Sequence, residues 1–418
     1  MVFNTVSQLF GKAISGGITF IISLLLAKTL GVEGYGDFTK ITTYVAFFYL
    51  FCDLGLNAAF LQLSKDEKLI HMKSSLFTVR LLLGLLLMFI TLIILVFLPG
   101  SATQGYTQFV KMGIIIFIPS ILFQALISTT NAIFQEHLRY DLATYALCAG
   151  SIGTLILVWL SIFLLSPNVL LFAIIAAFLI GSFMTAGLSY VLIKKVTKLP
   201  VIFWDPKSVK QLLKAAAPLA LTLIFNVVYF YANTFILTIT QSTLDVGIYG
   251  LAYKFFEFTL VIPTFFMNAA LPTLIESYVK KDMMVFRKRI LLSAIALTGV
   301  AVGVAILGWI FTPLLALIRP GFAASILPLR LLITGLPIFY LTSITMWILV
   351  VTKKQKELIG IYGITMVLNI ALSLLCTPTY SYMAAVWITI GTECFVLASS
   401  VAVIIKSGIF RLQLDTKK

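Results

Sequence analysis

Residues 81–98 read LLLGLLLMFITLIILVFL, a run without a single charged side chain. As an α-helix this run would rise about 27 Å, close to the roughly 30 Å of hydrocarbon in a bilayer. Strands of a membrane barrel alternate apolar and polar residues, and this run does not. The stretch therefore predicts a transmembrane α-helix.

The rest of the chain repeats this pattern. Of its 418 residues 61% are hydrophobic and 11% are charged, and the mean hydropathy is +1.08, which excludes an ordinary soluble domain. Backbone polar groups in lipid must be satisfied within each segment, which favours helices. We predict an all-α polytopic membrane protein with twelve transmembrane helices, at residues 9–31, 38–63, 77–98, 110–135, 142–165, 169–193, 218–240, 249–275, 290–311, 326–351, 358–377 and 382–405.

The net charge of +15 is distributed by topology. Lys and Arg gather in alternate connections, at residues 64–73, 194–214, 280–289 and 353–356, whereas the connections at 99–109, 166–168 and 377–382 have none. Such a pattern marks the cytoplasmic side and predicts a multi-pass protein with both termini in the cytoplasm. It argues against a nucleic-acid partner. The four cysteines and two histidines lack the spacing of a metal site, so we expect no metal and no cofactor.

Two short stretches match each other at a spacing of 214 residues. YGDFTK at residues 35–40 corresponds to YGLAYK at residues 249–254, and the apolar segments before them align at the same spacing. Six helices per copy would cross the membrane in the same sense, as in a parallel repeat. We predict a six-helix lobe at residues 1–195, a cytoplasmic amphipathic linker at 196–217, a second six-helix lobe at 218–406 and a cytoplasmic tail at 407–418.

The linker carries a helix-start signal. Asp205 followed by Pro206 is typical of an N-cap and a first-turn proline. We predict a short basic helix that Pro218 ends or kinks. With Leu212 and Leu213 on one side, this helix is expected to lie on the membrane surface.

Polar residues recur at helical spacing on matching segments of the two copies. In lipid such stripes mark a side that faces protein or water. Thr222, Asn226, Tyr229 and Asn233 of the seventh segment correspond, 214 residues earlier, to Gln8, Lys12, Ser15 and Thr19 of the first. Lys40 and Tyr44 share a face of the second segment, and Lys254 and Glu257 share the equivalent face of the eighth. We predict a substrate cavity lined by Lys12, Thr19, Lys40, Tyr44, Asn226, Tyr229, Asn233, Lys254 and Glu257.

Lysines beside hydroxyl groups suit an anionic, hydroxyl-rich ligand. Segments 9–31 and 218–240 contain no Asp or Glu, which disfavours an organic cation. Two alternatives stay open. Lys40 and Lys254 lie near the outer ends of their helices, where a lysine can also snorkel to the interface. Glu257, three residues after Lys254, is placed to pair with it along the helix.

Two further stripes have two explanations each. Ser120, Gln124, Ser128, Asn131 and Gln135 share one side of the fourth segment, and Tyr362, Thr365, Asn369 and Ser373 share one side of the eleventh. Hydrogen bonds between helices and the lining of a cavity explain these stripes equally well.

Short motifs in both halves carry a family resemblance. They are AKTLG at 27–31 with GYG at 34–36, DLGL at 53–56, GIYG at 247–250, AYK at 252–254 and ALP at 270–272. With the twelve-segment layout, they make the chain similar to the Wzx-type O-antigen or polysaccharide repeat-unit flippases of the MOP exporter superfamily, which also holds MATE drug exporters and lipid II flippases.

The resemblance implies a MATE-like fold, with two six-helix lobes forming a V around a central cationic cavity. It implies alternating access that moves an undecaprenyl-pyrophosphate-linked oligosaccharide across the bacterial inner membrane, for O-antigen, capsule or exopolysaccharide. The implied partners are this lipid-linked substrate, membrane lipids, a coupling ion (proton or sodium) and the polysaccharide polymerase machinery. Many relatives carry an Asp near Asn233, and its replacement weakens the case for carboxylate-based ion coupling there.

Two other functions remain to be weighed. A MATE-like cation exporter would be expected to carry acidic residues in segments 9–31 or 218–240. A membrane polymerase or ligase would be expected to use a sizeable outer loop with catalytic side chains, and the outer loops here are short. We therefore expect a transporter and not an enzyme.

Overall fold

The computed structural model describes residues 2–64, 71–101 and 103–407. Within its helices, the side chains of residues 2–10, 12, 218, 219, 221, 222, 226 and 268 lie outside the described set, and so does the predicted tail from residue 408 onward. Helices make up nearly all of the described chain, and the extended contacts found there are two isolated bridges, Gly100 with Gly105 and Gln104 with Ser242.

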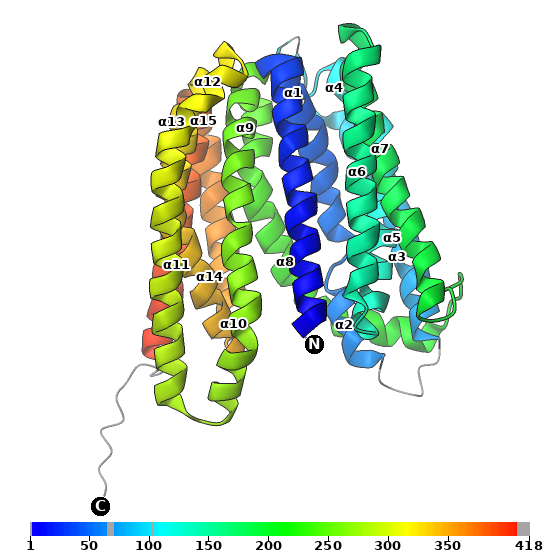
Figure 1. Cartoon of the computed structure of the whole chain (residues 1–418), viewed down its shortest axis with the longest axis vertical. Coiled ribbons are helices and arrows are strands. Elements are labelled where there is room, and N and C mark those ends of the chain that lie inside the picture. The colour runs from blue at the N-terminus through cyan, green and yellow to red at the C-terminus, as the bar shows by residue number, and fades with distance from the viewer. Residues whose placement is uncertain (1, 65–70, 102, 408–418) are drawn as a thin grey trace, which may run out of the picture. The chain divides into compact units, whose positions relative to one another are not determined.

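The chain divides into two compact units, residues 1–250 and 251–418. The first holds α1 (Val2–Phe51), α2 (Leu56–Leu63), α3 (Met72–Phe97), α4 (Gln108–Phe117), α5 (Ser120–Glu136), α6 (Tyr140–Leu164), α7 (Pro167–Leu192), α8 (Pro206–Thr240) and the start of α9 (Thr243–Thr259). The second holds the rest of α9, α10 (Val261–Val279), α11 (Met283–Phe311), α12 (Leu315–Ile318), α13 (Ile326–Thr334), α14 (Leu336–Val351) and α15 (Gln355–Lys406). Figure 1 shows these helices coloured along the chain.

Many of these helices are long and apolar enough to cross a bilayer. Among the described residues nine helices meet that condition, or ten if the pair Pro320–Thr334 and Leu336–Val351, bent by 41°, forms one span. The prediction of an all-α, multi-pass membrane protein is confirmed at this level.

Two of the longest helices are broken inside. In α1 the backbone of Gly31 has φ 72° and ψ −173°, and in α15 Ser381 has φ 51° and ψ −140°. Neither conformation belongs to a helix. Both breaks fall where the sequence predicts a boundary between consecutive segments, after residue 31 and between residues 377 and 382.

A third break was not predicted. The segment 38–63 divides between α1 and α2, where Leu54 has φ 41° and Gly55 has φ 79°. The Asp53 carboxylate accepts a hydrogen bond from the Asn57 backbone N–H at 3.0 Å, which satisfies one free donor at the start of α2. The break is therefore stabilised by its own side chains.

Helix α8 begins as predicted but ends elsewhere. The Asp205 side chain caps it by accepting from the backbone N–H groups of Lys207 and Ser208. The helix then continues through Pro218 to Thr240, so Pro218 does not end it, and of the two predicted effects only a kink stays open.

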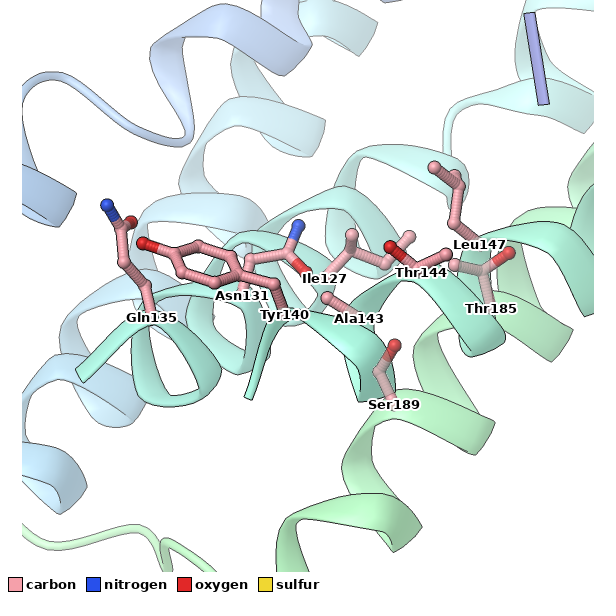
Figure 2. A pocket seen from close by; sticks show the side chains of 9 residues that line it. All are labelled: Ile127, Asn131, Gln135, Tyr140, Ala143, Thr144, Leu147, Thr185 and Ser189. Carbon is pink, nitrogen blue, oxygen red and sulfur yellow. The ribbon is translucent and has the colours of Figure 1, made fainter. Parts of the chain in front are cut away.

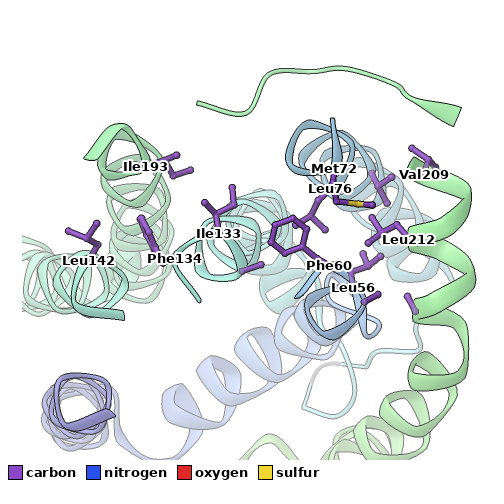
Figure 3. Close-up of a cluster of buried hydrophobic side chains, with 14 of the residues drawn as sticks. Leu56, Phe60, Met72, Leu76, Ile133, Phe134, Leu142, Ile193, Val209 and Leu212 are labelled. Carbon is purple, nitrogen blue, oxygen red and sulfur yellow. The ribbon is translucent and has the colours of Figure 1, made fainter. Parts of the chain in front are cut away.

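The first turns of α8 pack on protein. Val209, Leu212 and Ala216 are buried in a cluster with Phe60 of α2 and Leu76 of α3, shown in Figure 3. Leu213 is exposed. The expected placement of both leucines on a membrane surface is therefore wrong for Leu212, which packs against α2 and α3 of the first unit.

Helix α3 shows the opposite behaviour. Along it, large apolar side chains are exposed, among them Leu82, Leu86, Phe89, Val96 and Phe97. Exposed leucine and phenylalanine on a membrane-length helix indicate a surface that faces lipid. This exposure agrees with the predicted transmembrane helix at residues 81–98.

Candidate substrate-binding site

Lys40 is the most enclosed of the predicted site lysines whose side chains are described. It lies on α1 after the Gly31 break and is 1% exposed. Its Nζ donates to the Gly105 carbonyl at 2.9 Å and to Thr243 Oγ1 at 2.6 Å. The Lys40 ammonium is therefore bonded to protein groups and enclosed by them.

The two acceptors belong to neighbouring connections that are bonded to each other. Thr243 donates through its hydroxyl to the Thr103 carbonyl at 3.0 Å, and its backbone N–H bonds the same oxygen at 2.9 Å. The Gly105 N–H donates to the Thr238 carbonyl at 3.0 Å. Lys40 thus braces three pieces of chain, namely α1, the 103–107 connection and the turn from α8 to α9.

The energetics favour this enclosure. Burying an ammonium away from water is costly unless hydrogen bonds receive it. Each hydrogen bond to a charged group contributes about 1.5–3 kcal/mol, and Lys40 makes two. Asp37, one turn earlier, also interacts with the ammonium electrostatically. Its Oδ1 is buried without a hydrogen-bond partner among the described residues.

Glycines let the backbones approach closely beside Lys40. A Cβ placed on Gly36 would lie 2.1 Å from the Thr243 carbonyl oxygen, and one on Gly247 would lie 2.1 Å from the Val32 carbonyl oxygen. A Cβ on Gly250 would lie 2.6 Å from Thr39 Oγ1. Gly36 and Gly250 are the paired glycines of the 214-residue repeat. Each glycine of this pair therefore lies where the backbones of α1 and α9 are in close contact.

Tyr44 lies one turn beyond Lys40. Its hydroxyl donates to the Thr91 carbonyl of α3 at 2.8 Å. Its ring packs edge-on against Tyr106 and Phe235, with centroids 5.6 and 6.2 Å away. The structure thus places Tyr44 in a packed aromatic group, 2% exposed, between α1 and α8.

The other described residues of the first stripe are bonded within the protein. The Thr19 hydroxyl donates to the Ser15 carbonyl at 2.9 Å, and Ser15 Oγ lies 2.7 Å from Ser151 Oγ of α6. On α8, Tyr229 and Asn233 are buried, 6% and 4% exposed. The side chains of Lys12 and Asn226 lie outside the described residues.

Lys254 and Glu257 lie in the second unit and pair with each other. Lys254 Nζ is 2.9 Å from Glu257 Oε2, and the two side chains are 40% and 47% exposed. The predicted pairing is confirmed. Lys254 and Lys40, equivalent in the repeat, differ in setting, since one is accessible and ion-paired and the other is enclosed.

The role of one charged residue, Arg80, was not predicted from the sequence. The Arg80 side chain is completely buried, and its Nη2 donates to Asp53 Oδ1 at 2.6 Å and to Asn57 Oδ1 at 2.8 Å. Asp53 therefore has a structural role as the counter-ion of Arg80. Arg80 stands directly before the apolar run 81–98, and an arginine at the start of such a run was the signal that could have identified it.

Residues 1–279 match the family described as polysaccharide biosynthesis protein. The chain belongs to this family. No curated protein matches it.

Solved structures share its fold over nearly the whole chain. An inward-facing multidrug resistance MATE family transporter of the MOP superfamily covers 98% of this chain and 99% of its own, with 12% identity and a TM-score of 0.75. The lipid II flippase MurJ, in an inward closed conformation, covers 97% and 88%, with 18% identity and a TM-score of 0.74. A MOP superfamily transporter from Pyrococcus furiosus, titled for the reverse polarity of its binding pocket, covers 98% and 95%, with 12% identity and a TM-score of 0.68.

These findings confirm the resemblance at the level of family and fold. The named neighbours are transporters and a flippase, in agreement with the prediction that the chain is not an enzyme. At such low identities they show the fold alone.

Proposed function

We propose that this protein flips undecaprenyl-pyrophosphate-linked oligosaccharide repeat units from the cytoplasmic to the periplasmic leaflet of a bacterial inner membrane. The observation that carries the proposal is the match of a polysaccharide-biosynthesis family to a chain with a MOP transporter fold. A polysaccharide pathway that contains a multi-pass transporter needs its glycan moved across the bilayer. The polyprenyl tail would stay in lipid while the sugar and pyrophosphate cross inside the protein.

Twelve membrane spans in two six-helix lobes belong to this proposal. The nine membrane-length helices and the bent pair give ten spans, and the breaks at Gly31 and Ser381 would divide α1 and α15 into two spans each. The even number supports termini on the same side, which the lysine distribution places in the cytoplasm. We retain residues 1–195 and 218–406 as the proposed lobes.

Lysine side chains are proposed to receive the pyrophosphate. Lys254 is accessible beside Glu257. Lys40 is enclosed, and its ammonium would reach a substrate only when its bonds to Gly105 and Thr243 open. A pyrophosphate carries stronger acceptors than a carbonyl or hydroxyl, so it would compete for Lys40 during that opening. Coupling of substrate to the outer connections through Lys40 is one way to drive alternating access.

A complementation experiment tests the proposal. In a strain lacking the gene, the intact chain should restore surface glycan, and the triple variant Lys12→Ala, Lys40→Ala, Lys254→Ala should not, at equal membrane levels. Lys254→Ala alone, which removes the ion pair with Glu257 between two exposed side chains, should give partial loss without a folding defect. Lys356→Ala, an exposed lysine outside the proposed cavity, is the matched control. Full export by the triple variant would overturn the lysine assignment.

The MATE-like cation exporter remains the second candidate because a MATE transporter gives the same fold. It would require an acidic site, and Glu257 and the buried Glu393 are the carboxylates to test in the second unit. Resistance to cationic drugs on overexpression, abolished by Glu257→Gln or Glu393→Gln, together with normal glycan in the deletion strain, would favour it.

A further inference from the structure

The first unit contains a polar cavity apart from Lys40 and its neighbours. It lies between α5, α6 and α7 and has a volume of about 160 Å³. Figure 2 shows the side chains that line it, which are Ile127, Asn131, Gln135, Tyr140, Ala143, Thr144, Leu147, Thr185 and Ser189. The polar stripe predicted for the fourth segment, for which helix packing and cavity lining were both open, thus serves both purposes. Its Ser120 accepts a bond from Tyr49, whereas Asn131 and Gln135 line this cavity.

At one end of the cavity, α6 and α7 pack closely against each other. α6 and α7 cross at Gly150 and Gly181, where a Cβ on either glycine would lie 1.8 Å from a threonine hydroxyl of the other helix. From Thr185 at this crossing, the cavity extends along α7 to Ser189 and along α6 back to Tyr140. On α6, the backbone of α1 lies against Thr144, since a Cβ on Gly11 would lie 2.1 Å from its methyl group. The cavity therefore lies beside a tight helix crossing.

The lining has one chemical character. Two amides and four hydroxyls face it together with three aliphatic side chains, and none of the nine lining residues is charged. Thr185 and Ser189 are 6% and 1% exposed, whereas Asn131 is exposed, so the lining combines buried and accessible polar groups. The Thr185 hydroxyl donates to the Gly181 carbonyl at 2.9 Å, which leaves its lone pairs to accept. Such a lining satisfies neutral donors and acceptors and provides no counter-charge for a phosphate or an ammonium.

The volume of the cavity further limits the kind of ligand that it can hold. The cavity holds several water molecules' worth of volume but falls short of the roughly 300–1,000 Å³ of pockets for drug-sized ligands. A single sugar ring combines this size with hydroxyls that amides can bind in pairs. Tyr140 adds an aromatic ring on which the apolar side of a sugar can rest.

We propose that this cavity binds one neutral sugar ring of the glycan substrate. The inference rests on the proposed function and names a recognition subsite for it. Gln135 and Tyr140 flank the short connection at residues 137–139, on the side that the lysine pattern assigns to the cytoplasm. The sugar would therefore be selected where the substrate is loaded.

Binding of sugar by the purified full chain tests the subsite. The probes are the lipid-linked repeat unit extracted from the host, undecaprenyl pyrophosphate without sugar, and the released oligosaccharide. The variant Asn131→Leu, Gln135→Leu removes both amides at similar volume. The control Asn168→Leu removes an exposed amide at the start of α7. Thermal stabilisation titrated against each probe gives apparent affinities, and surface glycan in the complemented deletion strain gives the function.

The native chain and the control should bind the glycosylated lipid more tightly than the bare lipid. The amide variant should lose roughly tenfold in affinity for the glycosylated lipid and bind the bare lipid unchanged. Equal stabilisation by the released oligosaccharide would identify soluble sugar as a ligand of the same subsite, and stabilisation by the lipid-linked form alone would assign it to the membrane substrate.

Two results would overturn the subsite while leaving flipping intact. One is a native chain that restores glycan but binds both lipids equally. The other is an amide variant that keeps the native preference. A native chain that fails to restore glycan would instead refute the proposed function. If the amide variant does not accumulate in membranes, the smaller changes Thr144→Val and Ser189→Ala should lower affinity for the glycosylated lipid in the same direction.

Discussion

The charge of Arg80 is completely buried, and its partner Asp53 is more accessible. The Arg80 side chain is 0% exposed, whereas that of Asp53 is 34% exposed. Removing Asp53 would leave a buried cation without its counter-ion, a defect that costs about 3–5 kcal/mol. Removing Arg80 would leave a carboxylate that water already reaches.

We therefore expect Asp53→Ala to destabilise the protein more than Arg80→Met. The double variant should recover most of the difference, because it leaves no unpaired charge. Thermal unfolding of the three variants in detergent, combined in a double-mutant cycle, measures this order. Equal losses from both single changes would show that the ion pair does not control stability here.

The hydrogen-bond partners of Lys40 could not be predicted from the sequence, because they lie far from it along the chain. A stripe that contains Lys40 is visible in the sequence, but its acceptors lie 65 and 203 residues away. Whether a lysine snorkels, lines water or braces a connection depends on those acceptors. The pairing of Lys254 with Glu257 was predictable because a single helix places residues three apart on one face.

Among helices, the crossing beside Lys40 depends on glycine. Gly36→Ala would place a methyl group 2.1 Å from the Thr243 carbonyl oxygen, a contact that requires the helix to move. Gly187 of α7 has open space at the same position. Gly187→Ala should be neutral or stabilise α7 by about 0.5–1 kcal/mol, because alanine favours a helix interior.

Unfolding temperatures and membrane levels of the two variants check this prediction. Gly36→Ala should lower both relative to the native chain, and Gly187→Ala should lower neither. If Gly36→Ala matched Gly187→Ala, the close approach of α1 and the start of α9 would not be a structural requirement.

The N-terminal cap of α8 predicts a pH dependence. Hydrogen bonds, above all from the Ser208 side chain, lower the pKa of Asp205 below its ordinary value of 3.8. A carboxylate whose pKa is lower in the folded protein stabilises the fold above pH 3.8, and this contribution is lost as pH falls through the folded value. The first turn of α8 should therefore exchange its amide hydrogens faster at pH 3 than at pH 6 once the intrinsic rates are corrected.

In Asp205→Ala the first turn of α8 should exchange faster at both pH values, with no added pH dependence from this site. Val285, whose backbone N–H is capped by Asp282 at the start of α11, provides an internal comparison at another capped helix. Exchange in the first turn of α8 that is unaffected by Asp205→Ala would contradict the capping role.

Helix positions were predictable because each membrane span must satisfy its own backbone hydrogen bonds, which forces long apolar runs. The breaks were only partly predictable. Gly31 precedes a polar stretch and marks a boundary, whereas Leu54 adopts a positive φ that its side chain disfavours. Bonds from Arg80 and Asn57 to Asp53 stabilise that neighbourhood, and the linear sequence does not show such a network.

At the scale of the whole molecule, the family match and the shared fold agree with the resemblance that the sequence motifs carry. The two related halves expected from the 214-residue repeat stay a prediction. The repeat also has a local consequence, since its paired glycines Gly36 and Gly250 lie on helices that meet beside Lys40. The proposed sugar cavity was only partly predictable from the sequence. The polar stripe with Asn131 and Gln135 is evident there, whereas the residues of α6 and α7 that complete the lining are not.

The proposed topology of twelve spans makes its own prediction. Single cysteines placed at exposed Ser101, and at exposed Glu33 and Tyr380 beside the Gly31 and Ser381 breaks, should react with an impermeant thiol reagent added from the periplasm, in a background without the four native cysteines. A cysteine at exposed Lys356 should react only after the membrane is opened. Labelling of residue 356 from the periplasm would contradict the proposed topology.

Translocation by the purified chain tests the central claim most directly. The protein would be reconstituted into vesicles with the fluorescent lipid-linked repeat unit in both leaflets, and an impermeant glycosidase would be added outside. The account predicts that all of the substrate becomes cleavable in vesicles that contain the chain, and only the outer-leaflet fraction in empty vesicles. Equal cleavage in both kinds of vesicle would contradict the assignment of this protein as a flippase.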